Sequence, residues 1–552
     1  MARLQALFFG LCALNGALAQ TWCGKDYTVG SPIIPPGGQF AIPATSTEPL
    51  LTFRCAPAIK PYLGEDALAP AAIIVDTLIT YQQISGAASI TLPSSSQLGE
   101  LVVTVTANGK FLTTGVVPLN ASKTELPFSL TGLQTQKAAY NVSCTAMYSP
   151  SLGAKQTFQA TTALSYLPNP ESGSVTKMDL RSGSLLARPA NDPTGPYGTV
   201  FPLGFYTNWG GYLDTNYNFS FINDLAARGY TIVHPVPTYD NLTQLGLVVD
   251  RMAELGLYLM YDMRWDYQNA TAVTEQVNMF KNRSNLLLWY TGDEPDGSGD
   301  PLNATSLAYD LIYELDGYHP VSLVLNCQDY YFEEYTSGAD IVMQDTYPTG
   351  INATWSVEYH TECTPDYGCC GCDNCVGDFE DISERMDDFR VRLEALGWDR
   401  TKAVWAAPQA FGDAQFWNRV PSGKEFIVQS VLSINHGGLG IVPWNDPTTD
   451  DITNSATVLG KALPTLKSFI LSPSAVYRQH TANRVDVGMW TVGTQTLVLA
   501  TNLNYFNITL NLATLLLGSP QQVTEVYDSG ATYANGQIQL ESVGTGGFVI
   551  GL

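Results

Sequence analysis

Positive charge is scarce in this sequence. Its 552 residues contain 27 lysines and arginines against 51 aspartates and glutamates, a formal net charge of −24. The isoelectric point is near 4.4. A protein that binds nucleic acid or an anionic membrane needs a basic surface to meet the phosphate groups. The composition therefore argues against both partners and suits a protein that works in mildly acidic surroundings.

Histidine and the common catalytic motifs are also lacking. Five histidines in the whole chain leave little for a metal centre. The sequence contains no Gly-x-Ser-x-Gly nucleophile elbow, no phosphate-binding Gly-Lys-Ser/Thr loop and no His-Glu-x-x-His zinc motif. No Gly-x-Gly-x-x-Gly fingerprint follows a predicted strand. We therefore expect neither a cofactor nor a catalytic metal.

Membrane-spanning runs are missing, but the amino terminus is apolar. Arg3 precedes an apolar stretch over residues 7–14, and Ala17-Leu18-Ala19 matches a cleavage site. The stretch is too short to span a bilayer, and no later run approaches ~20 apolar residues. A buried helix is the alternative. We interpret residues 1–19 as a signal peptide and expect a secreted, extracellular protein that begins near Gln20.

Asparagine-linked glycosylation motifs agree with export. Nine Asn-x-Ser/Thr sequences are present, some of which arise by chance. They lie at Asn120, Asn141, Asn218, Asn241, Asn269, Asn282, Asn303, Asn352 and Asn507. This number favours a eukaryotic secretory route.

Cysteines are few but concentrated. Cys12 leaves with the signal peptide, and five of the remaining nine lie between residues 363 and 375. In an oxidising compartment such a cluster indicates a disulfide-stapled loop. Zinc is the alternative, because Cys372 and Cys375 have the CxxC spacing. Cys55 and Cys144 could staple an amino-terminal module, and the odd count leaves one thiol without a partner.

Hydrophobic periodicity divides the mature chain into three regions. Residues 20–190 and 474–552 show short strands and turns, which predict β-sandwich domains. Residues 198–470 alternate apolar strands with amphipathic helices. The strands are predicted at 201–206, 231–235, 258–263, 286–291, 321–326, 340–345, 403–407 and 438–444, and the helices at 221–228, 245–255, 304–315, 379–396 and 424–436. The fold class is therefore α/β, a (β/α)8 TIM barrel flanked by all-β sandwiches, with a doubly wound sheet as the alternative.

The fourth predicted strand ends in a cluster of acids. The apolar run from Leu286 to Thr291 is followed by Gly-Asp-Glu-Pro-Asp, where parallel barrels place their chemistry. Glycosidic bond hydrolysis needs a protonated carboxyl group for the leaving oxygen. Asp293 and a dry pocket would raise the pKa of Glu294, which makes Glu294 the candidate acid. A solvated acidic loop and a calcium site are the alternatives.

The second catalytic group is less evident. Enzymes with two catalytic glutamates place one after strand seven, but here that strand is followed by Gln409. Asp345, which ends the sixth predicted strand, could be a nucleophile or a base, or it could be a structural residue of the barrel rim. Alternatively, Asp293 orients a substrate acetamido group that itself attacks the anomeric carbon, with Tyr347 helping to hold it.

Aromatic and polar residues follow several predicted strands. Sugar rings stack on aromatic side chains, although any single aromatic residue can equally be part of the core. The substrate-binding residues that we predict at this rim are Tyr206, Trp209, Arg264, Trp265, Tyr347, Gln409 and Trp444.

Three segments give the chain a resemblance to the (β/α)8 glycoside hydrolases. They are the opening strand at 201–206, the segment at 289–296 that ends in Asp-Glu-Pro-Asp, and the Gly-rich close at 437–446. The adjacent Asp293 and Glu294 are similar to the pair of substrate-assisted N-acetylhexosaminidases of families 20 and 123. That resemblance implies that Asp293 steadies the acetamido group while Glu294 is the acid.

Together these features predict an extracellular glycoside hydrolase that acts on a poly- or oligosaccharide. A non-catalytic carbohydrate-binding or cell-wall protein on a degenerate barrel is the alternative, favoured by the missing carboxylate after strand seven. The sequence leaves the oligomeric state open.

Overall fold

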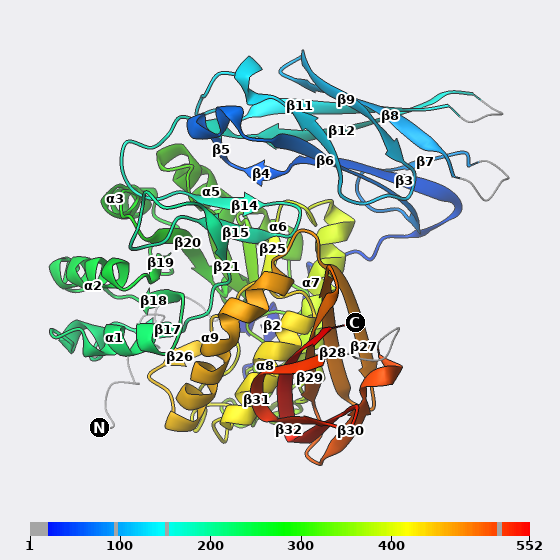
Figure 1. The fold of residues 1–552 in the computed structure, drawn as a ribbon. Helices are drawn as coiled ribbons and strands as arrows, with labels where there is room; N and C mark the ends of the chain where they lie inside the picture. The colour runs from blue at the N-terminus through cyan, green and yellow to red at the C-terminus, as the bar shows by residue number, and fades with distance from the viewer. Residues whose placement is uncertain (1–19, 93–97, 150–153, 516–521, 552) are drawn as a thin grey trace.

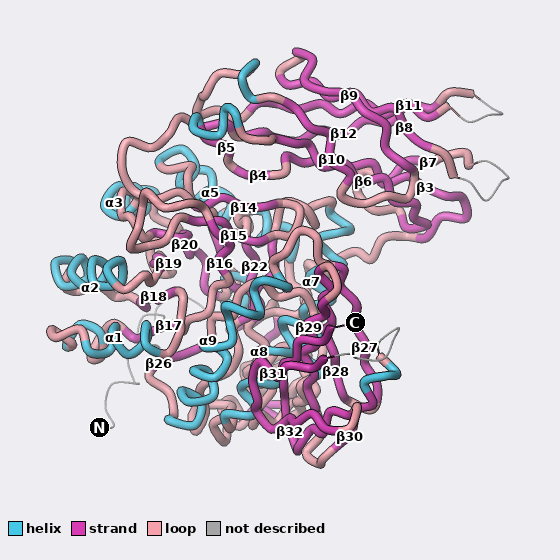
Figure 2. Tube along the Cα trace, in the orientation of Figure 1, coloured by secondary structure: helices cyan, strands magenta, loops and turns pink. Residues whose placement is uncertain are grey.

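The computed structural model describes residues 20–92, 98–149, 154–515 and 522–551. The predicted signal peptide lies outside these residues. Two strand-rich regions flank a central mixed α/β region, as the secondary-structure colouring in Figure 2 shows. The three regions follow one another along the chain in the order that the hydrophobic periodicity of the sequence predicts.

The amino-terminal region contains two four-stranded antiparallel sheets, in the orders β10-β6-β3-β7 and β12-β11-β8-β9. Inward-facing residues of both sheets form one hydrophobic cluster. The predicted Cys55–Cys144 disulfide is confirmed, and it joins β3 to β11 across this cluster. The strands are β3 (Thr45–Pro57), β6 (Ala71–Gln82), β7 (Ala87–Ser89), β8 (Glu100–Ala107), β9 (Lys110–Pro118), β10 (Thr124–Phe128), β11 (Tyr140–Tyr148) and β12 (Gln156–Leu164).

Eight parallel strands form one curled sheet in the order β25-β22-β21-β20-β19-β18-β17-β26. The middle strands are buried on both faces, which explains their continuous apolar sequences. Isolated parallel bridges, Ala406 to Ile441 and Gln409 to Trp444, link the two ends of this order. The strands are β17 (Tyr206–Asn208), β18 (Ile232–Val236), β19 (Tyr258–Asp262), β20 (Leu286–Asp293), β21 (Val321–Leu325), β22 (Ile341–Gln344), β25 (Ala403–Ala406) and β26 (Trp444–Asp446).

The first and eighth strands differ from the prediction. The predicted strands at 201–206 and 438–444 are replaced by the short β17 and β26, which begin where the predicted strands end. The preceding segments approach their neighbours too closely for ordinary side chains. A Cβ on Gly204 would lie 2.0 Å from the Ile232 carbonyl oxygen, and one on Gly440 would lie 2.4 Å from the Trp405 ring. These segments therefore make isolated bridges and single hydrogen bonds rather than regular ladders.

Helices cover the outer side of the sheet. Figure 1 shows α1, α2 and α3 stacked beside β17, β18 and β19. The predicted helices are present as α1 (Ser220–Ala227), α2 (Leu242–Glu254), α5 (Ala304–Leu315), α7 (Glu380–Leu396) and α8 (Gly423–Asn435). Our prediction missed α3 (Ala270–Phe280), α6 (Phe332–Ser337) and α9 (Asp450–Ile470), although α9 buries residues at helical spacing. Among the described residues, none of the helices combines the length and apolar character needed to cross a bilayer.

A small antiparallel sheet covers the amino-terminal ends of the parallel strands. Its order is β16-β15-β14-β4, and its apolar residues share a cluster with the interior of the parallel sheet. The strands are β4 (Ile59–Lys60), β14 (Thr176–Asp179), β15 (Ser184–Ala187) and β16 (Gly198–Val200). This end of the sheet is therefore closed by packing, which leaves the carboxyl-terminal ends for a site.

The carboxyl-terminal region is one six-stranded sheet rather than two separate sheets. The first half of β32 (Gln537–Gly551) pairs with β30 (Ile508–Asn511), and its second half pairs with β29 (Gln495–Asn502). The other strands are β27 (Val476–Ala482), β28 (Val485–Val492) and β31 (Gln522–Ala534). We predicted a sandwich of two sheets. We did not predict that one long strand, β32, pairs with β30 along its first half and with β29 along its second half. Figure 1 shows this sheet packed beside α8 and α9.

An ion pair between the buried Asp340 and the partly exposed Lys60 ties the small sheet to the parallel sheet, and it gives the first prediction. Asp340 accepts hydrogen bonds from Lys60 Nζ at 2.7 Å, Tyr309 at 3.0 Å, Tyr313 at 2.8 Å and the Val321 amide at 2.9 Å. Asp340→Asn leaves the Lys60 charge without a buried counterion. We expect the free energy of unfolding to fall by about 3 kcal/mol or more, measured by urea denaturation.

The matched control is Asp310→Asn, because Asp310 is exposed on α5. We expect that change to stay within about 0.5 kcal/mol. Equal unfolding midpoints for the two variants would show that Asp340 does not stabilise the junction.

Candidate active site

The predicted acids lie where β20 ends. Glu294 has a φ of 53°, a left-handed conformation that breaks the strand directly after Asp293. The pairing of β20 with β21 also shifts register between Tyr290 and Asp293. The Glu294 amide still donates to the Val324 carbonyl at 3.1 Å, which fixes the turn. Because the alternation of a regular strand stops here, the two consecutive carboxyl groups are not forced to opposite faces of the sheet.

Asp293 is held by two donors. The Nη1 atom of Arg264 lies 2.6 Å from its Oδ2 atom, and the Tyr290 hydroxyl donates to its Oδ1 atom. Burial raises the pKa of Asp293, although the Arg264 charge opposes that effect. Arg264 also places its guanidinium 5.1 Å from the ring centre of Trp444 and 5.3 Å from that of Tyr206. The predicted residues Tyr206, Arg264 and Trp444 therefore lie together beside Asp293.

Arg264 also forms an ion pair with a second acid, Asp262. Asp262 accepts from the Arg264 Nε atom at 2.8 Å, and its Oδ2 atom lies 2.7 Å from His234 Nε2. Burial favours the neutral form of Asp262, but Arg264 and His234 outweigh it and hold the pKa of Asp262 below its usual value. Burial lowers the pKa of His234, so its imidazole is neutral at ordinary pH. The arginine is thus fixed between Asp262 and Asp293.

Glu294, which is partly exposed, and Asp345, which is buried, form a carboxyl pair. Asn326 donates from one Nδ2 atom to Glu294 Oε1 at 3.0 Å and to Asp345 Oδ1 at 3.2 Å. Burial raises the pKa of Glu294, and the nearby Asp293 charge adds to this. Burial and the charge of Glu294 raise the pKa of Asp345 well above its ordinary range. Two such carboxyls cannot both ionise at low cost, so the pair retains a proton to higher pH than isolated acids do.

Asn326 belongs to the site but was not among the residues predicted there. The available signal was its position, because it is the last residue of the predicted strand 321–326. Asp296 fixes the backbone at this point: its carboxylate accepts from the amides of Asn326 at 3.2 Å and Cys327 at 2.8 Å. Burial raises the pKa of Asp296 to about 7. The third acid of the Asp-Glu-Pro-Asp segment therefore supports the loop that carries Asn326.

The amino-terminal hairpin completes this wall of the site. Its strands are β1 (Thr21–Trp22) and β2 (Lys25–Asp26). The indole N–H of Trp22 donates to Asn326 Oδ1 at 2.9 Å, which turns the Asn326 NH2 group toward the carboxyl pair. A disulfide between Cys23 and Cys327 anchors the hairpin. No local pattern in the sequence links these residues, which are about 300 positions apart.

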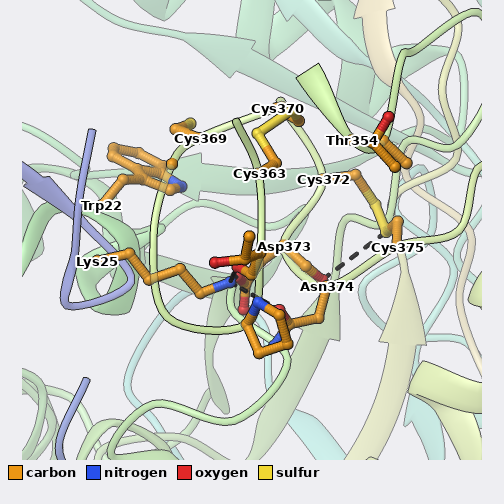
Figure 3. A pocket seen from close by; sticks show the side chains of 15 residues that line it. Trp22, Lys25, Thr354, Cys363, Cys369, Cys370, Cys372, Asp373, Asn374 and Cys375 are labelled. Atoms are coloured by element: carbon orange, nitrogen blue, oxygen red, sulfur yellow. Dashed lines mark hydrogen bonds and ion pairs between the residues drawn. A yellow bond between two sulfur atoms is a disulfide. The ribbon is translucent and has the colours of Figure 1, made fainter. Parts of the chain in front are cut away.

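The cysteine-rich loop lies against the hairpin. It contains the disulfides Cys363–Cys370 and Cys372–Cys375, which confirms the disulfide interpretation of the cluster. Trp22 and Lys25 line a cavity of about 250 Å³ within this loop (Figure 3). Lys25 Nζ lies 2.5 Å from an Asp373 carboxylate oxygen, and both side chains are buried. The loop and the hairpin are thus joined by an ion pair as well as by packing.

Among the described residues, one group brings candidate metal-ligand atoms close together. Its members are Cys23, Cys327 and Asp373. Both sulfur atoms belong to the disulfide, so they are not free thiolates. This grouping therefore fits a structural staple better than a metal centre.

Two predicted substrate-binding residues are part of the core instead. Trp209 has 0 % exposure and donates to Asp240 at 3.2 Å. Gln409 also has 0 % exposure, and its amide bonds to the backbone of Thr349 and Phe411. Both were assigned to the rim because they follow strands. A loop has no periodicity that shows whether a side chain points toward the site or into the core. A substrate-binding role for these two residues stays a prediction, and both side chains are engaged in hydrogen bonds within the fold.

Tyr347 and Trp265 occupy different positions. Tyr347 is buried near the carboxyl pair, and burial followed by the Asp345 charge raises the pKa of its hydroxyl. Its ring packs against Phe411 and Trp417. Trp265 is 52 % exposed, and its indole donates to the Pro237 carbonyl at 3.4 Å. Tyr347 therefore belongs to the carboxyl cluster, whereas Trp265 lies on the surface.

The unpaired cysteine gives a prediction for the disulfide pattern. Cys369 is the one free thiol among the described residues, and burial raises its pKa to about 12. A thiol reagent should therefore detect one thiol per mature chain after unfolding without reductant, and react slowly with the native protein. Cys369→Ser should reduce the count to zero. A count of three or more in the unmodified protein would contradict the pairing.

Comparisons with known proteins gave structural likeness only. No family model matches the sequence, and the search of curated proteins found no match. A solved structure described as "Glycoside hydrolase" is 12 % identical with a TM-score of 0.44, over 64 % of this chain and 93 % of that chain. The FMN-binding β-glucuronidase from Facaelibacterium prausnitzii L2-6 is 11 % identical with a TM-score of 0.34, over 92 % and 70 %. The Ruminococcus gnavus β-glucuronidase in complex with D-glucuronic acid is 10 % identical with a TM-score of 0.34, and the match spans 72 % of this chain and 61 % of that one. These structural neighbours are glycoside hydrolases.

Proposed function

We propose that the protein is an extracellular glycoside hydrolase in which Glu294 is the general acid. The observation that carries this proposal is the carboxyl pair of the partly exposed Glu294 and the buried Asp345, bridged by Asn326 beside the ionic cluster of Asp293 and Arg264. A carboxyl group that keeps its proton to higher pH is what the departing glycosidic oxygen requires. The four disulfides of the described residues fit export into an oxidising compartment.

The catalytic region is proposed to be a closed (β/α)8 barrel over residues 198–470. The curled eight-stranded order and the bridges between its two ends support closure. The flanking regions at 20–190 and 474–552 are proposed as accessory β domains. Glu294 and Asp345 follow β20 and β22, so both lie at the carboxyl-terminal edge, where barrel enzymes build their sites.

The reaction can be written with these groups. Glu294 gives its proton to the glycosidic oxygen as the bond between that oxygen and the anomeric carbon breaks. The anomeric carbon develops positive charge, which the Asp293 carboxylate stabilises. A water molecule then adds to this carbon, and its proton returns to Glu294. The net change consumes one water and forms two hydroxyl-bearing products.

Geometry favours Asp293 over Asp345 as the second group. Arg264 and Tyr290 both donate to Asp293 and oppose the rise in its pKa that burial causes. Asp345 instead shares a hydrogen bond with Glu294, and its pKa is raised well above the usual range. A nucleophile must be ionised and stand ~5 Å from the acid in a retaining enzyme. Asp345 is therefore proposed to keep the proton available to Glu294.

A carbohydrate-binding protein without turnover is the second candidate. The observation that favours it is Gln409, which occupies the position after β25 where two-glutamate enzymes have a carboxylate. A binding site would gain little, however, from a pair of repelling acids. The variant below separates the two functions.

Glu294→Gln should abolish hydrolysis while sugar binding remains. We expect turnover to fall about 100- to 10,000-fold, because the amide cannot donate the proton. The assay uses a panel of glycans, half of them with 2-acetamido sugars. Turnover confined to that half would support Asp293 as the group that orients the acetamido oxygen, and turnover of plain hexosides would support attack by water or a carboxylate.

The control is Glu334→Gln, because Glu334 is exposed on α6. Unchanged turnover in Glu294→Gln would reject the acid assignment. Binding without turnover in the unmodified protein would establish the second candidate.

Asn326→Ala should move the pH profile. The Asn326 hydrogen bond lowers the pKa of Glu294, so its loss should raise that pKa. Activity requires protonated Glu294 and falls as pH rises through its pKa, so the alkaline limb should shift to higher pH. We also expect kcat/KM to fall about 10- to 100-fold from the lost charge-assisted bond. A lower rate with an unmoved alkaline limb would show that Asn326 acts on folding alone.

A further inference from the structure

Five of the nine glycosylation motifs lie in loops that follow parallel strands. Asn218 precedes α1, and Asn241, Asn269 and Asn303 are the residues directly before α2, α3 and α5. Asn352 follows β22. In a parallel sheet with outer helices these loops all lie at the carboxyl-terminal edge. We call these five residues the rim asparagines, and all five side chains are exposed.

Four of the rim asparagines use only their carbonyl oxygen within the fold. The Oδ1 atoms of Asn218, Asn241, Asn269 and Asn352 accept from backbone amides at 3.0–3.3 Å. In the described part of the chain, no Nδ2 atom of the five donates a hydrogen bond, and the hydrogen bonds fix which amide atom is the oxygen.

This geometry is compatible with a glycan at each position. An N-linked glycan replaces one hydrogen on Nδ2 and leaves Oδ1 free to accept. The cap that Asn241 or Asn269 gives to its helix therefore persists after modification. If an asparagine Nδ2 atom donated a buried hydrogen bond, glycosylation would require that bond to break. The rim asparagines make no such bond, so their modification does not carry this free-energy cost.

We propose that the rim asparagines carry N-linked glycans and that these form a collar around the carboxyl-terminal edge of the sheet, where Glu294 and Asp345 lie. The collar admits single, soluble oligosaccharide chains and keeps the faces of insoluble polysaccharide away from the carboxyl pair. The occupancy of the sites is independent of the function proposed above, whereas the effect on substrates rests on it. Asn282 lies in the loop between α3 and β20, at the opposite edge of the sheet, and belongs to no collar.

Occupancy is measured on the full chain secreted from a yeast. Enzymatic release of N-glycans in ¹⁸O-water converts each glycosylated asparagine to ¹⁸O-labelled aspartate, which peptide mass spectrometry locates. We expect the label at all five rim asparagines. Absence of the label from most of them would overturn the proposal, whatever the occupancy of Asn120, Asn141, Asn282 and Asn507.

The effect on substrate choice is tested by changing all five rim asparagines to aspartate. Aspartate keeps an acceptor oxygen for the helix caps and cannot be glycosylated. We expect the rate on an insoluble polysaccharide to rise several-fold relative to the rate on a soluble oligosaccharide of the same linkage. The matched control, Asn120→Asp with Asn282→Asp, removes glycans elsewhere and should leave this ratio unchanged.

A second variant separates the loss of glycan from the added charge. Thr243→Ala with Thr271→Ala abolishes the motifs of Asn241 and Asn269 and keeps both asparagines, and both threonines are exposed. This double variant should raise the ratio of the rate on insoluble polysaccharide to the rate on soluble oligosaccharide, as the aspartate variant does. An unchanged ratio in both variants, with the sites occupied in the parent, would overturn the collar. If no glycan is hydrolysed at all, the proposed function fails, and the mass spectrum alone decides the glycan assignment.

Discussion

The burial of several acids around one arginine is the constraint on which the site depends. Asp262, Asp293, Glu294 and Asp345 meet at the carboxyl-terminal edge of the sheet, and Arg264 is the cation that the structure places among them. Desolvation makes each negative charge costly, so the cluster is stable only if part of it stays protonated. Arg264 satisfies Asp262 and Asp293 directly. The proton is therefore left to Glu294 and Asp345, which share the Asn326 amide. A protonated carboxyl group at this edge follows from the charge balance, before any reaction is considered.

Asn326 connects this balance to parts of the chain that are distant in sequence. Trp22 orients the Asn326 side chain, and Arg385 donates to the backbone carbonyl oxygen of Asn326 at 2.8 Å. The hairpin that carries Trp22 is too short to have a core of its own. It is held instead by the Cys23–Cys327 disulfide and by the Lys25–Asp373 ion pair. Covalent and ionic links thus supplement packing in this wall, as is usual for small elements in oxidising compartments.

The sequence predicted the middle of the sheet well because buried parallel strands are continuous apolar runs, as in β19 to β22. It also predicted an interruption after Thr291, since Gly292 and Pro295 follow the apolar run, although β20 continues to Asp293. The first and eighth strands were not predictable, because Gly204 and Gly440 reflect close approaches to residues distant in sequence. The same reason applies to Trp22 and Asn326, whose hydrogen bond has no local pattern. The burial of Trp209 and Gln409 could not be predicted, because a loop gives no periodicity from which the direction of a side chain can be inferred.

The absence of a carboxylate after β25 has a structural reason. Gln409 donates from Nε2 to the carbonyl oxygens of Thr349 and Phe411, and its Oε1 atom accepts from the Thr349 amide at 3.0 Å. A glutamate at this position could accept but not donate, so two buried carbonyl oxygens would face a negative charge. The position therefore requires both a donor and an acceptor, which glutamine provides. This loop is committed to backbone hydrogen bonds, and the carboxyl groups that Asn326 bridges follow β20 and β22 instead.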